Sequence, residues 1–294
     1  MASPRVTVII PTYNWSTVLP YAINSVLAQT MRDFELIVVG DACTDDSEQV
    51  VAAIQDPRVR WINLPVNSGH QAGPNNRGLQ EAKGEFIAYL GHDDLWLRHH
   101  LQCMTDALER AGAGAGVAHS LLMSIPPGQE TGMPVLPIPG VGSAPSCTLY
   151  RRSVTDRIGG WRDYRGLKMP PEIDLFQRAQ AAGFEVVFVP RLTAIKFPAL
   201  DRKDVYRDRP SHEQALWLQR IRSDPDFEPT CLTRMIATDQ AVRALPARKL
   251  VRILGQELKK RLAWRLARRS GHRAIFWSKK GAGIDLQKRY KGVE

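Results

Sequence analysis

The first hundred residues alternate short apolar segments with segments of helical spacing, and this alternation limits the fold more than any other feature of the chain. Four apolar segments rich in β-branched residues are typical of buried strands: Val6–Ile10, Phe34–Val39, Val59–Leu64 and Glu85–Leu90. Apolar residues between them predict three helices, over residues 16–29, Asp45–Ile54 and Gln71–Ala82. Strands separated by helices pair in parallel, so the pattern predicts a mostly parallel, open α/β sheet flanked by helices.

The second half of the chain is less regular. Residues 125–145 are rich in Pro and Gly, which excludes a regular helix or a central strand there. Beyond this loop the pattern predicts a helix over residues 172–182 and a strand over Val186–Val189. The chain reads as helical from Ser211 onward, and leucines at i+4 spacing predict a long helix near Arg248–Arg269.

The net charge of +10 is concentrated in the last part of the sequence. Residues 243–294 hold 16 Lys and Arg against 3 acids, whereas residues 1–242 hold 24 against 27. A basic segment of this kind predicts an anionic partner such as membrane lipid, nucleic acid or an acidic polymer. Because the rest of the chain is nearly neutral and has acidic strand ends, we expect no nucleic acid but a peripheral contact with an anionic membrane.

Two further features bear on location. The sequence has no apolar run long enough to cross a membrane, and Val6–Ile10 is too short for a signal peptide. We therefore expect a cytoplasmic protein that associates with the inner face of the membrane. The four cysteines lack metal-binding spacing and are predicted to be buried thiols.

Polar side chains stand at the carboxyl ends of the predicted strands, where open α/β sheets bind their ligands. These residues are Thr12, Asn14, Asp41, Asp93 and Asp94. Two adjacent carboxylates repel each other unless a cation or hydrogen-bond donors neutralise them, and their hard oxygen atoms suit Mg²⁺ or Mn²⁺. An acidic cap for the helix after Trp96 is an equally good interpretation of the Asp pair on spacing alone. Taken alone, Asp41 reads more readily as a turn residue, and Thr12-Tyr13-Asn14 as a strand-to-helix turn.

Taken together, these segments resemble the family-2 glycosyltransferases, which have the GT-A fold. The resemblance begins with Val8-Ile9-Ile10-Pro11-Thr12-Tyr13-Asn14 and continues through Asp33–Val39 and Asp41–Ser47. It extends through Asn67-Ser68-Gly69, Asn76-Arg77-Gly78, Ala82–Ile87 and Leu90-Gly91-His92-Asp93-Asp94. The order and spacing of these segments are far more specific than any single one, and the match covers roughly residues 4–200.

The resemblance implies roles for the strand-end residues. Thr12, Tyr13, Asn14, Asp41 and Arg77 would lie at the nucleotide, with Asp41 accepting a hydrogen bond from the base. Asp94 would hold the metal, and Asp93 the ribose or the metal. The chain departs from the commonest pattern because Gly40 and Gly91 stand where acids often occur, which predicts weaker metal binding. The nearby His92, His99 and His100 are interpreted as surface residues.

The same resemblance implies a general base. Gly159-Gly160-Trp161, followed by Pro171-Glu172-Ile173-Asp174, is similar to the acidic segment of the family. The catalytic acid of that segment falls on Glu172, which would take the proton from the acceptor hydroxyl, and Asp174 is the second candidate. The alternative is that both acids only stabilise the first turn of a helix, through its dipole.

The resemblance therefore implies an inverting, metal-dependent glycosyltransferase. It would use Mn²⁺ or Mg²⁺ and move a sugar from a nucleoside-diphosphate sugar, with UDP favoured, to a glycan or glycolipid hydroxyl. Two alternatives stay open: transfer to a polyprenyl phosphate, which needs no base, and a catalytically silent module that only binds the nucleotide sugar. The expected division is a catalytic domain over residues 1–200 and a helical, basic extension over residues 201–294. Residues 1–100 of the domain would serve the donor, and residues 101–200 the acceptor.

Overall fold

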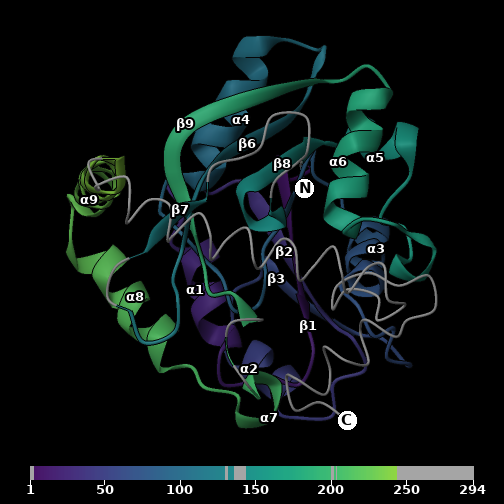
Figure 1. Ribbon diagram of the computed structural model, residues 1–294. Coiled ribbons are helices and arrows are strands. Elements are labelled where there is room, and N and C mark those ends of the chain that lie inside the picture. Colours follow the sequence, from purple (N-terminus) through teal and green to yellow (C-terminus); the bar gives the residue numbers. More distant parts are fainter. Residues whose placement is uncertain (1–2, 130–131, 136–143, 200–201, 203, 244–294) are drawn as a thin grey trace, which may run out of the picture.

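The computed structural model describes residues 3–129, 132–135, 144–199, 202 and 204–243. Within them, nine strands form one sheet in the order β3-β2-β1-β4-β8-β6-β9-β5, and β7 pairs with β6 (Figure 1). The bounds in sheet order are β3 Val59–Asn63, β2 Phe34–Gly40, β1 Val6–Thr12, β4 Phe86–Tyr89, β8 Thr148–Arg151, β6 Ala115–Ser124, β9 Glu185–Lys196, β5 Leu95–Trp96 and β7 Met133–Val135.

The sheet is parallel where the sequence predicts it to be parallel. β1 pairs in parallel with both β2 and β4, β2 pairs in parallel with β3, and β6 pairs in parallel with β9. Antiparallel pairing is confined to β8, β5 and β7. The predicted α/β class, a mostly parallel sheet flanked by helices, is therefore confirmed.

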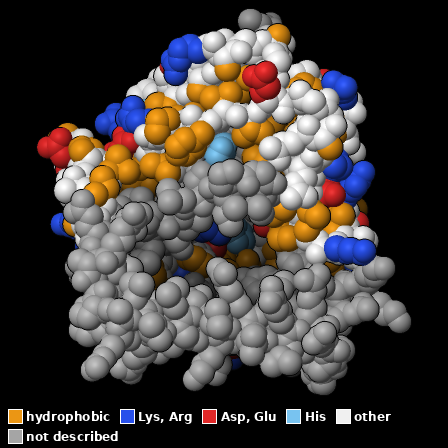
Figure 2. Space-filling model, turned by 45° about the horizontal axis from the view of Figure 1, so that its top comes forward, with side chains coloured by type: hydrophobic (Ala, Val, Ile, Leu, Met, Phe, Trp, Pro, Cys, Tyr) orange, Lys and Arg blue, Asp and Glu red, His pale blue; other side chains and the backbone are white. Residues whose placement is uncertain are grey.

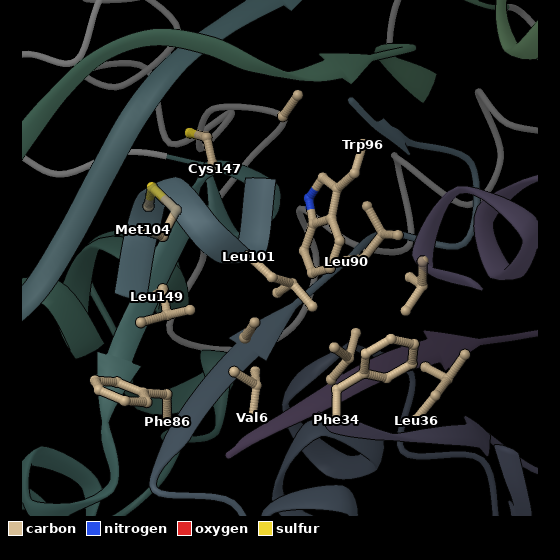
Figure 3. Close-up of a cluster of buried hydrophobic side chains, with 14 of the residues drawn as sticks. Val6, Phe34, Leu36, Phe86, Leu90, Trp96, Leu101, Met104, Cys147 and Leu149 are labelled. Atoms are coloured by element: carbon tan, nitrogen blue, oxygen red, sulfur yellow. The ribbon is translucent and has the colours of Figure 1, made fainter. Parts of the chain in front are cut away.

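Helices cover both faces of the sheet because successive strand residues point to opposite sides. On one face, α1 (Leu19–Leu27), α2 (Ser47–Ala52) and α4 (His100–Ala111) pack on alternate residues of β1, β2 and β4. Figure 3 shows part of this cluster, with Val6, Phe34, Phe86, Trp96 and Leu101 among its labelled members. On the other face, α3 (Ala72–Glu81), α5 (Arg152–Ile158) and α6 (Pro171–Ala181) pack on the intervening residues, such as Ile9, Ile37 and Ile87.

The last described helices pack on the far part of the sheet. α8 (His212–Ser223) and α9 (Phe227–Arg243) contact β5, β6 and β9 through a third apolar cluster that includes Trp217, Ile221 and Phe227. A short helix, α7 (Val205–Asp208), precedes them. Helical structure after Ser211 is thus confirmed through Arg243. The predicted helix near Arg248–Arg269 lies outside the described residues, and the division at residue 200 stays a prediction.

Two element bounds differ from the prediction for local reasons. The helix expected over residues 16–29 begins at Leu19, because the Ser16 backbone N–H donates to Asp45 Oδ2 (2.8 Å) and Pro20 occupies the first turn. The Pro/Gly-rich loop contains β7, but this strand lies at the edge of the sheet, as Pro requires. Within the described residues, no helix combines the length and apolarity that crossing a membrane requires.

Candidate active site

The carboxyl ends of β1, β2 and β4 are tied together by hydrogen bonds. The Asp41 backbone N–H donates to the Thr12 carbonyl (2.8 Å), which joins the ends of β2 and β1. The Thr12 hydroxyl lies 2.8 Å from Nδ1 of His92, which follows β4. Three of the predicted strand ends therefore form one continuous wall, as parallel pairing requires.

Asp41 is buried and shapes the loop opposite it. Its Oδ1 accepts from the Ser68 backbone N–H (2.8 Å), and its Oδ2 accepts from that of Gly69 (3.2 Å). Gly69 has a φ of 77°, a conformation that favours glycine. Asp41 thus holds the Asn67-Ser68-Gly69 segment beside the end of β2, and a carboxylate oxygen can accept more than one hydrogen bond.

Asn14 shapes the neighbouring loop. Its backbone is left-handed, with a φ of 43°, which Asn adopts more readily than most residues. Its Oδ1 accepts from the backbone N–H groups of Thr44 (2.8 Å) and Asp45 (3.3 Å). Tyr13 beside it is partly buried. The Thr12–Asn14 turn and the 41–46 loop therefore support each other at the predicted nucleotide position.

Gly40 has a packing reason to lack a side chain. A Cβ at this position would lie 2.6 Å from both Asn63 Oδ1 and the Trp61 ring. Asn63 fills that space and bonds the backbone of Cys43 in both directions, at 2.9 Å each. The amide of Asn63 therefore stands where an acid at position 40 would need room.

Asp94 is completely buried, and its carboxylate accepts hydrogen bonds from three donors. Its Oδ2 accepts from the Ser146 hydroxyl (2.5 Å) and lies 3.2 Å from the Lys196 ammonium. Its Oδ1 accepts from the Phe197 backbone N–H (3.2 Å). Burial and the adjacent Asp94 charge raise the pKa of Asp93.

The alternative interpretation of the Asp pair as a helix cap is wrong. α4 begins only at His100, and His99 occupies the position before it. The interpretation of the histidines as surface residues is also wrong for two of them. His92 and His100 are buried, and His100 stacks on Trp96 (4.1 Å between ring centroids) with its Nδ1 2.7 Å from the Thr193 hydroxyl.

Gly91 faces the Asp pair. A Cβ at position 91 would lie 3.0 Å from Asp94 Oδ2 and 3.2 Å from Asp93 Oδ1. Both carboxylates therefore approach the same point, and an acid at position 91 would add a third negative charge there. The absence of that acid leaves the group less negative than the common family pattern would make it.

Glu172 and Asp174 have different surroundings although both lie in the first turn of α6. Glu172 is partly buried, which raises its pKa, and its Oε2 accepts from the Gln71 side chain (3.3 Å). Asp174 is paired with Arg178 (2.7 Å), which also donates to the carbonyl groups of Ile158 and Gly160. Asp174 is thus tied to the segment before α6 through Arg178, whereas Glu172 accepts a hydrogen bond from the neutral Gln71 side chain.

Arg77 is placed apart from the other predicted residues. Its guanidinium pairs with Glu81 (2.7 Å), one turn further along α3 and away from the strand ends. Its side chain is 41% exposed. Contact between Arg77 and the nucleotide stays a prediction that this pairing does not support.

Sequence reasoning did not identify Lys196, the residue that connects the two groups of acids. Burial alone would lower the pKa of its ammonium, but Asp94, Asp93 and Glu172 hold that pKa above its ordinary value. Lys196 therefore interacts both with Asp93 and Asp94, which follow β4, and with Glu172 of α6. The strand-end rule would have found it, had β9 been predicted to continue to residue 196.

Aromatic side chains close the site on another side. Trp15, His92 and Tyr206 of α7 form a cluster with ring centroids 5.3–6.2 Å apart. Burial and the charges of Asp93 and Asp94 raise the pKa of Tyr206. Figure 2 shows one face of the molecule, where acidic, basic and histidine side chains are visible in a recess.

The mostly parallel sheet, with acids beyond β4 and a further acid at the start of α6, agrees with the GT-A-like fold that the resemblance implies. The family model described as "Glycosyl transferase family 2" matches residues 7–159, just over half of the chain. The chain belongs to glycosyl transferase family 2.

Among curated relatives, the chain is 36% identical over 121 residues to the GalNAc(5)-diNAcBac-PP-undecaprenol beta-1,3-glucosyltransferase of Campylobacter jejuni. That match covers 40% of this chain and 37% of the relative, so the chain spans well under half the length of the protein it resembles.

Two solved structures share the fold. S. aureus TarS, residues 1–349, in complex with UDP-GlcNAc superposes with a TM-score of 0.56 at 20% identity, over 66% of this chain and 58% of that one. The mannosyltransferase PcManGT from Pyrobaculum calidifontis, in complex with GDP-Man and Mn²⁺, gives 0.55 at 18% identity, over 99% and 88%.

Proposed function

We propose that this chain transfers a sugar from a nucleoside-diphosphate sugar to a hydroxyl group of a glycan or glycolipid acceptor, with inversion at the anomeric carbon. The observation that carries the proposal is the position of Lys196, whose Nζ lies 3.2 Å from Asp94 Oδ2 and whose ammonium is also attracted by Asp93 and Glu172. This arrangement supports a single site in which Asp93 and Asp94 would serve the diphosphate and Glu172 the acceptor, although these acids are far apart in the sequence.

The donor would lie along the ends of β1, β2 and β4. Asp41, with the backbone it holds at residues 67–69, would face the base, and Thr12, Tyr13 and Asn14 would line the same side. A UDP-sugar is favoured because the TarS structure contains UDP-GlcNAc, although PcManGT holds GDP-Man on the same fold. Asp93 would reach the ribose or the cation.

The residues present fit a divalent ion, Mn²⁺ or Mg²⁺, if the donor diphosphate supplies the remaining ligands. Among the residues that the structure describes, no three His, Cys, Asp or Glu side chains form a metal-binding group. Asp94 and Asp93 would therefore share the ion with the donor diphosphate, as is common for Mg²⁺. The bound ion would neutralise the charge of the departing diphosphate. Such an ion must compete with the donors that Asp94 already has.

Glu172 would take the proton of the attacking hydroxyl. Its raised pKa strengthens it as a base relative to an exposed carboxylate, and Gln71 orients one of its oxygen atoms. A single in-line displacement with a base on the acceptor side inverts the anomeric configuration. A hydroxyl acceptor has to lose a proton, whereas a polyprenyl phosphate is already an anion and needs no base. A base at Glu172 therefore favours a hydroxyl acceptor.

The Glu172→Gln variant tests the assignment. Donor binding should be unchanged, while the rate of transfer falls by roughly 10²–10⁴, the usual contribution of a general base. Asp174→Asn is the matched control, because it lies on the same turn but is paired with Arg178; its main effect should be on thermal stability. Turnover near the wild-type rate in Glu172→Gln would favour the polyprenyl-phosphate alternative, and any measurable donor turnover rejects the silent module.

A lipid-linked acceptor would bring the enzyme to the cytoplasmic face of a membrane. The Campylobacter relative is named for an undecaprenol-linked acceptor, and the basic residues 243–294 of this chain would contact anionic lipid. Sedimentation with anionic vesicles at low salt should deplete the full chain but not a chain that ends at Val242. Failure of the full chain to bind would reject the membrane contact and leave the transfer reaction untouched.

A further inference from the structure

Lys196 occupies the position where a cation would meet Asp94. It is the last residue of β9, and its Nζ lies 3.2 Å from Asp94 Oδ2. The Asp94 side chain is 0% exposed, whereas that of Lys196 is 36% exposed. The lysine therefore reaches the buried carboxylate from the more open side of the site.

The donors around Asp94 leave little room for a second cation. Oδ2 has Ser146 and Lys196 as partners, which is the usual capacity of one carboxylate oxygen, and Oδ1 has the Phe197 backbone N–H. Phe197 donates through its backbone N–H, and the Ser146 carbonyl accepts a hydrogen bond from the Trp96 indole. Lys196 is the only one of these three donors with a long, flexible side chain and a full charge, so it is the partner that a divalent ion would displace.

The charges around Lys196 favour its transfer to another anion within the site over its release to solvent. Lys196 is attracted to Asp93, Asp94 and Glu172 together, and all three would lose part of that attraction if it left for solvent. A donor diphosphate bound beside the Asp pair would offer the displaced ammonium a new anionic partner within the same site. Lysine suits this task because its ammonium is a compact charge on a four-carbon stem.

We propose that Lys196 is a built-in cation of the donor site, which neutralises Asp94 when no divalent ion is bound and contacts the donor diphosphate when an ion takes the Asp pair. This inference rests on the proposed function for the identity of the diphosphate. It predicts that Lys196 weakens metal binding to the empty enzyme and strengthens nucleotide binding.

The test uses the full chain and its Lys196→Met variant, with Lys83→Met as the control, because Lys83 is exposed and lies just before β4, at the opposite end of the strands. Binding of Mn²⁺ alone is followed by loss of the free-ion electron paramagnetic resonance signal. Lys196→Met should bind Mn²⁺ about tenfold more tightly, because a competing positive charge a few ångströms away is gone. At saturating Mn²⁺, the same variant should bind UDP about tenfold more weakly by calorimetry, because the ammonium that would contact the diphosphate is gone. Lys83→Met should match the wild type in both measurements.

A second variant guards against misfolding, since Lys196→Met leaves Asp94 buried without its counter-charge. Lys196→Arg keeps the charge and should bind Mn²⁺ alone, and UDP at saturating Mn²⁺, within about threefold of the wild type. Unchanged or weaker Mn²⁺ binding by Lys196→Met, with a melting temperature like that of the wild type, overturns the competition. Tighter Mn²⁺ binding by Lys196→Arg overturns it as well.

Unchanged UDP binding by Lys196→Met overturns the contact with the diphosphate. If the wild type binds no nucleoside diphosphate at all, the proposed function fails, while Mn²⁺ binding still decides the competition.

Discussion

Asn76 of α3 and Trp161, in the segment before α6, are joined by two hydrogen bonds. Asn76 Oδ1 accepts from the Trp161 backbone N–H (2.7 Å), and Asn76 Nδ2 donates to the Trp161 carbonyl (2.8 Å). The pairing attaches the segment before α6 to α3. The following Gly78 lets α3 approach β1, because a Cβ there would lie 2.6 Å from the Ile9 side chain. Asn76 and Gly78, both from one sequence motif, thus position the Glu172 side of the site relative to the strand ends.

Asn76→Ala should loosen this connection. Loss of two hydrogen bonds to the backbone is expected to lower the free energy of unfolding by about 1–3 kcal/mol. Transfer should slow by about tenfold as Glu172 loses its position, with UDP affinity unchanged. Chemical denaturation and steady-state kinetics provide the measurements. Gln80→Ala, an exposed position on the same helix, is the control, and equal kinetics in the two variants would show that Asn76 does not position the base.

The raised pKa of Glu172 predicts a pH-dependent stability effect. A carboxyl group whose pKa is raised on folding contributes stability that is present below its unfolded pKa and lost as pH rises through its folded pKa. Glu172→Gln should therefore melt at a higher temperature than the wild type at pH 8, and the difference should vanish at pH 4. Glu185→Gln, an exposed carboxylate, should show no such pattern. A Glu172→Gln variant less stable than the wild type at pH 8 would be inconsistent with burial of the charged form.

Glu228 should have the opposite dependence. Burial would raise its pKa, but hydrogen bonds from Arg191 and His99 outweigh burial and lower it to about 2. Its stabilising contribution is thus present above the ordinary pKa of 4.5 and lost as pH falls toward 2. At pH 7, Glu228→Gln should cost about 1–2 kcal/mol, less than a fully buried pair, because the Arg191 side chain is 47% exposed.

Calorimetric melting at pH 7 and pH 3 would measure this contribution. Asp208→Asn is the comparison, because the Asp208–Arg207 pair is exposed on both sides and should contribute nearly nothing. If Glu228→Gln and Asp208→Asn behave alike at pH 7, the contact between α9 and β9 does not depend on Glu228.

The first half of the fold could be predicted from the sequence because β1, β2 and β4 are buried on both faces and read as continuous apolar runs. β6 and β8 were not predicted. β6 begins beside several glycines and includes His119 and Ser120, so its sequence lacks a clear apolar pattern. β8 has only four residues, between the Pro/Gly-rich loop and α5.

The candidate site was predicted in part for a related reason. Thr12, Asp41, Asp93 and Asp94 could be predicted because they stand at the carboxyl ends of β1, β2 and β4, and the ends of these strands are clear in the sequence. Lys196 was missed because Pro190 interrupts β9, and a Pro in a strand pattern indicates its end. In the structure the register against β6 shifts there, from Val189 opposite Ser120 to Leu192 opposite Leu121, and the strand continues. Arg191, in this irregularity, pairs with Glu228.

The most direct test of the account is thermal melting of the full chain with nucleoside diphosphates, in chelator and with Mn²⁺. Ligands that bind only the folded state raise the melting temperature by mass action, so at about 100 times its Kd a nucleotide adds about 2.7 kcal/mol. UDP should raise the melting temperature slightly in chelator and more with Mn²⁺. Asp94→Asn should abolish the additional stabilisation that Mn²⁺ gives and keep the stabilisation seen in chelator. No stabilisation by any nucleoside diphosphate, with or without Mn²⁺, would contradict the account.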